Sequence, residues 1–176
     1  DWETTHKALH AYSKVVGVVQ RAHASKWWHI SLNVVTNGLV TDNIPIPGGG
    51  IFNLRMDLRK HQVVLAKDDG GEQMFSMTDG LSANAFAEGL LGAVGELGLA
   101  GEYAREKFES GDALQYDPAA AERFFSALVN IDRSLKKHRA ALSGELGFVQ
   151  LWPHGFDIAF EWFGTRVIES EEHGEV

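Results

Sequence analysis

The sequence predicts a single α+β domain, in which an antiparallel sheet of five to six strands carries about three helices, mainly on one face. Apolar residues recur every three or four positions over residues 3–23, 82–98 and after Pro118, a spacing typical of amphipathic helices. Elsewhere apolar and polar residues alternate in short runs bounded by turns, as in antiparallel strands. The 176 residues, 44% of them hydrophobic and 23% charged, are enough to bury one core.

Each helix is predicted from a stripe of apolar residues and from residues that suit a helix end. The apolar stripe over residues 3–23 ends near His23, which we place at the edge of the core. Ser82 is a suitable N-cap for the second helix, and Asp117-Pro118 is a strong start for the third. The stripe of the third helix contains four residues: Phe124, Leu128, Ile131 and Leu135.

Strands are predicted where apolar and polar residues alternate, which gives the apolar pattern a period of two residues. Residues 51–58 give the clearest alternation, and residues 61–66 and 73–77 continue it as a meander joined by tight turns. Residues 27–34 form a further half-buried strand, and residues 39–41 are a short strand at best. Residues 148–152 and 157–162 read as two strands around a Pro-His-Gly interruption.

Composition restricts the classes of function. The chain has no cysteine, which excludes disulfides, thiolate nucleophiles and cysteine-ligated metals. A net charge of −8 argues against nucleic acid as a partner, and no apolar run approaches the roughly 20 residues that span a membrane. We therefore expect a cytoplasmic protein whose domain covers residues 1–168, followed by an acidic flexible tail at 169–176. Five tryptophans and ten phenylalanines are more than one small core easily hides, and they predict a homodimer.

The most pointed constellation for chemistry is Trp152-Pro153-His154-Gly155-Phe156-Asp157. His154 is a candidate base or ligand, and Asp157 could orient an imidazole or bind a cation. Regular strand geometry would point these two side chains to opposite faces, whereas a bulge at Gly155 could bring them together. We therefore predict irregular pleating at 153–156, with His29 or His10 within reach. The alternative is a structural turn with a solvated imidazole.

Two further groups of residues are candidates. Alternation places Trp27 and His29 on one side of their strand, where they could line a cleft or be covered by a partner subunit. His6 and His10 share a helix face with Glu3 and could present two nitrogens and a carboxylate to a metal. The spacing predicts that this face lies opposite the apolar stripe, where an exposed pair needs no function.

Several blocks together resemble a bacterial family catalogued only as a domain of unknown function: Leu9-His10, Trp27-Trp28-His29, Tyr116-Asp117-Pro118, Ile131-Asp132-Arg133 and Leu151 to Asp157. The WWH and PHxFD blocks are the most specific of these. The resemblance implies a single unit in a short form, because members of the family continue with a further segment. It marks His10, His29, His154 and Asp157 as candidates and supplies no activity.

Two classes of function follow from these residues. The first is a small-molecule-binding module, whose ligand lies in an aromatic and histidine-lined cleft near Trp27, His29, Trp152 and His10. The alternative is a metal-assisted or acid–base hydrolytic enzyme centred on His154 and Asp157. The sequence identifies no cofactor and no confident metal site.

Overall fold

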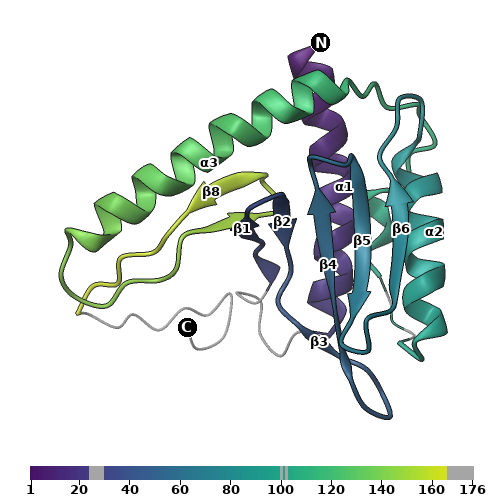
Figure 1. Cartoon of the computed structure of the whole chain (residues 1–176), viewed down its shortest axis with the longest axis horizontal. Coiled ribbons are helices and arrows are strands. Elements are labelled where there is room, and N and C mark those ends of the chain that lie inside the picture. The colour runs from purple at the N-terminus through teal and green to yellow at the C-terminus, as the bar shows by residue number, and fades with distance from the viewer. Residues whose placement is uncertain (24–29, 100, 102, 166–176) are drawn as a thin grey trace.

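The computed structural model describes residues 1–23, 30–99, 101 and 103–165, and it confirms the predicted α+β class. Three long helices and a six-stranded antiparallel sheet make up most of this part of the chain (Figure 1). None of the described helices is both long and apolar enough to cross a membrane. The tail predicted at residues 169–176 lies outside the described residues.

The helices begin where the sequence offers caps. The described helical segments are α1 (Trp2–His23), α2 (Ala83–Glu96), the 3-10 turn η2 (Arg105–Lys107) and α3 (Pro118–Ala140). The Ser82 hydroxyl accepts the backbone N–H of Ala85 at 3.1 Å, and the Asp117 carboxylate accepts that of Ala119 at 2.9 Å. Both bonds satisfy donors that the first helical turn leaves free.

The main sheet has the order β1-β2-β4-β5-β6, with β3 paired to β4, and all pairs are antiparallel. Its strands are β1 (Asn33–Val35), β2 (Gly38–Val40), β3 (Ile44–Pro45), β4 (Ile51–Asp57), β5 (Gln62–Lys67) and β6 (Glu72–Ser76). On β4, Phe52, Leu54 and Met56 are buried as the alternation predicts.

Helices α1 and α2 cover one face of this sheet, and α3 runs across the molecule beside α1 (Figure 1). The rings of Tyr12 on α1 and Phe86 on α2 lie 4.7 Å apart within the core. The α1 stripe is buried as predicted, and His23 is partly buried at its end. The long first helix therefore packs against α2, α3, β3 and η2.

A short hairpin of β7 (Gln150–Trp152) and β8 (Asp157–Ala159) forms a second sheet. It is linked to the region before β1 by an antiparallel bridge between Leu32 and Leu151, with backbone bonds of 2.7 and 2.9 Å in the two directions. Trp152 pairs with Asp157, so residues 153–156 form the tight connection. The predicted departure from regular pleating at 153–156 is therefore present as a turn.

Two local predictions were wrong. Of the strand expected at 27–34, the described part is strand only from Asn33, because Leu32 makes its backbone bonds to Leu151 instead. The α3 stripe fails at Ile131, which is 47% exposed, while the neighbouring Asp132 is only 8% exposed. Oδ2 of Asp132 accepts a hydrogen bond from Lys136 Nζ at 2.8 Å, whereas its Oδ1 is buried with no hydrogen-bond partner among the described residues.

Candidate functional site

A cavity of about 230 Å³ opens between α1, the turn at 153–156, η2 and Ile30. Its inner surface is apolar and comprises Gly17, Val18, Ile30 and Pro153, of which all but Ile30 are buried. Apolar walls of this kind favour the non-polar body of a small molecule, because its burial releases water from both surfaces.

The outer lining of the same cavity is basic. Lys14 and Arg21 come from α1, Lys107 comes from η2, and the exposed ring of His154 comes from the turn. None of the three permanent cations forms an ion pair with another described residue. The cavity therefore combines an apolar interior with positive charge at its mouth, in a chain whose net charge is −8.

Helical periodicity explains how α1 supplies four lining residues. Lys14, Gly17, Val18 and Arg21 stand at positions i, i+3, i+4 and i+7, which lie on one face of a helix. Gly17 has a specific steric role, because a Cβ there would lie 2.9 Å from Cβ of Pro153. Its lack of a side chain lets the turn approach α1 and form the wall of the cavity.

Two polar contacts fix the turn against α1. His10 Nε2 lies 2.9 Å from the carbonyl oxygen of His154, so this nitrogen carries the proton and donates it. The Ser13 hydroxyl donates to the carbonyl of Pro153 at 3.3 Å in a buried setting. Burial lowers the pKa of His10 below its ordinary 6.5, against an opposing contribution from the bond to His154.

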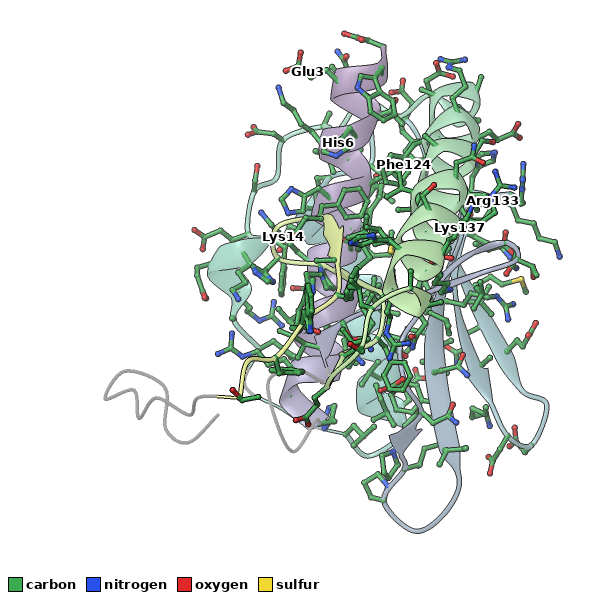
Figure 2. All side chains as sticks on the ribbon, turned by 90° about the vertical axis from the view of Figure 1, so that its left-hand side faces the viewer. Glu3, His6, Lys14, Phe124, Arg133 and Lys137 are labelled. Carbon is green, nitrogen blue, oxygen red and sulfur yellow. The ribbon has the colours of Figure 1, made fainter. Side chains whose placement is uncertain are left out.

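An aromatic cluster beside these contacts anchors the end of the turn. Phe156 is 7% exposed and adopts φ 56°, in the left-handed region that few non-glycine residues occupy. Its ring stacks on Phe124 at 5.2 Å and on His10 at 5.6 Å, and lies 5.3 Å from His6. Figure 2 shows His6 and Phe124 between α1 and α3. The cluster holds Phe156 in this conformation by surrounding its ring.

The cluster overturns the metal hypothesis for the first helix. His6 and His10 are half-buried against aromatic rings, not on an exposed face opposite the core, and Glu3 is exposed and bonded to Lys7. The spacing argument failed because α3 and the β7–β8 turn cover a second side of α1. Within the described residues no group of three histidine, aspartate or glutamate side chains could hold a metal ion.

The structure brings some of the predicted site residues together and separates others. The ring of His10 contacts the main-chain carbonyl of His154 and not the His154 ring. Trp152 is buried, with its ring 6.2 Å from that of His154. No hydrogen bond or ion pair joins His154 to Asp157, whose exposed carboxylate folds over Gly155. Trp27 and His29 lie outside the described residues. The described residues thus give the hydrolytic alternative no support.

Sequence reasoning missed the three cations of the cavity. Lys14 and Arg21 repeat at seven residues on the face that also holds His10, a signal that could have been found. Lys107 had no such signal, because residues 97–117 show no clear period and its position depends on the tertiary fold.

Comparison with known proteins gives one match. A search of curated proteins and a search of solved structures both found no significant similarity. A family model described as a family of unknown function, DUF5996, matches residues 1–176. That match spans the elements that form the cavity, from α1 to the β7–β8 turn. The chain therefore belongs to the DUF5996 family.

Proposed function

We propose that this protein is a binding module for a small molecule that carries an anionic group on an apolar body. The observation that carries the proposal is the cavity itself, in which an apolar interior is lined by three cations that form no ion pair with another described residue. Cations with no protein partner are available to an anionic ligand, and charge-assisted hydrogen bonds are about twice as strong as neutral ones.

The size of the cavity supports a small ligand. A volume of about 230 Å³ is slightly below the range of pockets that hold drug-sized molecules, so a single ring with one polar substituent is the appropriate scale. The buried Val18 and Pro153 supply contact for the ring, and the half-buried Lys14 and the exposed Arg21 line the cavity where its anionic group would meet solvent.

The predicted cleft residues have different parts in this proposal. His154 lines the cavity, and His10 positions the turn that carries it. Trp152 is buried directly before the turn. Trp27 and His29 immediately precede the lining residue Ile30 in the chain, and we propose that they extend the same site.

The test is calorimetric titration at pH 8 with benzenesulfonate and with benzenesulfonamide, its uncharged analogue. We expect benzenesulfonate to bind with a dissociation constant on the order of 1 mM, as suits about ten non-hydrogen atoms. The sulfonamide should bind at least about tenfold more weakly, because it lacks the charge that the cations recognise.

Variants locate the binding. Lys14→Gln and Arg21→Gln should each weaken benzenesulfonate binding by about threefold to tenfold. Lys137→Gln is the matched control, because Lys137 is exposed on the outer side of α3, away from the cavity (Figure 2). Equal binding of the sulfonate and the sulfonamide would overturn the proposal, as would equal effects of the three substitutions.

A further inference from the structure

The charge inventory of the cavity points to a narrower ligand class, and this inference rests on the proposed function. We infer that the cavity selects a small molecule with a doubly negative group of the phosphate monoester type. The total positive charge that lines the cavity, and not any single cation, indicates the charge of the ligand.

Six of the other lysines and arginines in the described residues form an ion pair with a carboxylate, and five do not. Lys7 lies 2.7 Å from Glu3, Lys67 lies 2.8 Å from Asp69, and Lys136 lies 2.8 Å from Asp132. The cavity differs from these ion pairs because the described residues that line it include three cations and no carboxylate.

The dipole of α1 explains only one of these cations. Arg21 stands in the last turn of α1, where a positive charge is favourable without any ligand. Lys14 is in the middle of the helix and Lys107 comes from a separate element, so the dipole accounts for neither. All three line one cavity, where each positive charge adds to the electrostatic potential that an anion would meet.

One negative charge cannot neutralise this set. A monoanion leaves two of the three cations uncompensated, whereas a phosphate monoester carries nearly two charges and three acceptor oxygens. The three oxygens offer separate acceptors to donors that come from two elements, α1 and η2. The exposed imidazole of His154 is a fourth group beside them.

The apolar interior requires the phosphate to be attached to a body. Inorganic phosphate would leave Val18, Ile30 and Pro153 in contact with water, so it would gain only the electrostatic part of the binding. A phosphate ester on an apolar ring uses both parts of the lining. A phosphate ester on a macromolecule has the same charge as one on a small molecule. The cavity volume of about 230 Å³ favours the small molecule.

The experiment compares three probes at pH 8 by calorimetry: phenyl phosphate, benzenesulfonate and inorganic phosphate. The first two share a ring and a tetrahedral head group and differ by about one charge, since the second pKa of a phosphate ester is about 6. We expect phenyl phosphate to bind about tenfold more tightly than benzenesulfonate, and inorganic phosphate to bind more weakly than phenyl phosphate.

Substitution of Lys107 tests the convergence of the two elements. Lys107→Gln should reduce the preference for phenyl phosphate over benzenesulfonate from about tenfold to about threefold, whereas Lys137→Gln should leave the ratio unchanged. Circular dichroism and the melting temperature verify that both exposed-site variants are folded.

The possible results separate this inference from the proposed function. Equal affinity for phenyl phosphate and benzenesulfonate would overturn the doubly negative class while the anion-binding proposal stands. Inorganic phosphate binding as tightly as phenyl phosphate would overturn the requirement for an apolar body. Binding of neither aromatic anion at concentrations of about 10 mM would overturn both proposals.

Discussion

At the scale of single residues, Gly17 determines how closely the β7–β8 turn approaches α1. Glycine within a helix normally costs stability relative to alanine, because the unfolded chain gains freedom. Here the missing Cβ leaves room for Pro153, whose own Cβ would lie 2.9 Å from a Cβ at position 17. The cost in helix propensity is offset by the packing of the turn.

Gly17→Ala should therefore destabilise the protein, by about 1–3 kcal/mol, because the ring of Pro153 is held by the turn and cannot move freely. Gly92→Ala is the matched control. Gly92 lies inside α2 with nothing within 4 Å of an added Cβ, and alanine there should stabilise by about 0.5–1 kcal/mol. Urea unfolding of both variants measures the two changes, and opposite signs are the expected result.

At the scale of elements, the β7–β8 hairpin is too short to be stable alone and depends on its anchors. Two-stranded hairpins are marginal in water unless they pack on something else. Phe156 supplies this packing by inserting its ring among Phe124, His6 and His10. The wall of the cavity thus depends on a side chain that does not line it.

Phe156→Ala should cost about 3–5 kcal/mol of unfolding free energy and should also weaken benzenesulfonate binding, because the turn loses its anchor. Phe148→Ala provides the comparison, since Phe148 is 74% exposed and its loss should cost below about 1 kcal/mol. Chemical denaturation and calorimetry of the two variants give the measurements. A Phe156→Ala protein as stable as Phe148→Ala would contradict the anchoring role.

Elements with long apolar stripes could be predicted from the sequence, and the site largely could not. The stripe over residues 3–23 predicted α1 to within one residue, because one continuous core covers it. The α3 prediction lost accuracy after Leu128, where the helix extends past the main sheet and Ile131 faces solvent (Figure 1). The cavity joins segments that are unrelated in sequence, so local periodicity contained no information about Lys107.

At the scale of the whole molecule, buried imidazoles link folding to pH. Burial lowers the pKa of both His10 and His23 from the ordinary 6.5. His10 faces Lys14, His6 and His154, whose charges lower its pKa further. A lowered pKa in the folded state means that the unfolded chain takes up the proton first as the pH falls.

The unfolding free energy should therefore be fully present above the unfolded-state pKa of about 6.5 and should decrease as the pH falls from there towards the lowered folded-state pKa values. A His10→Gln/His23→Gln double variant should show a flatter profile over this interval. His138→Gln, which removes an exposed ring on α3, serves as the control. Urea titrations at about six pH values measure the slopes, and equal slopes in the wild type and the double variant would contradict this linkage.

The homodimer suggested by the aromatic content stays a prediction. Most described aromatic side chains are buried, but those of Phe148, Trp162 and Phe163 are 74%, 60% and 46% exposed. Apolar surface of this kind is compatible with an interface, and light scattering measures the oligomeric state.

The contact between α1 and the β7–β8 turn also determines when the cavity can form during synthesis. The bond from His10 to the carbonyl of His154 spans 144 residues, nearly the whole described chain. A ribosome that adds about 5–20 residues per second needs roughly 7–30 s to supply the second partner after the first. During that interval the face of α1 that carries Lys14 and Gly17 has no hairpin to cover it. The cavity is therefore completed only after residues 153–156 have been synthesised and have packed against α1.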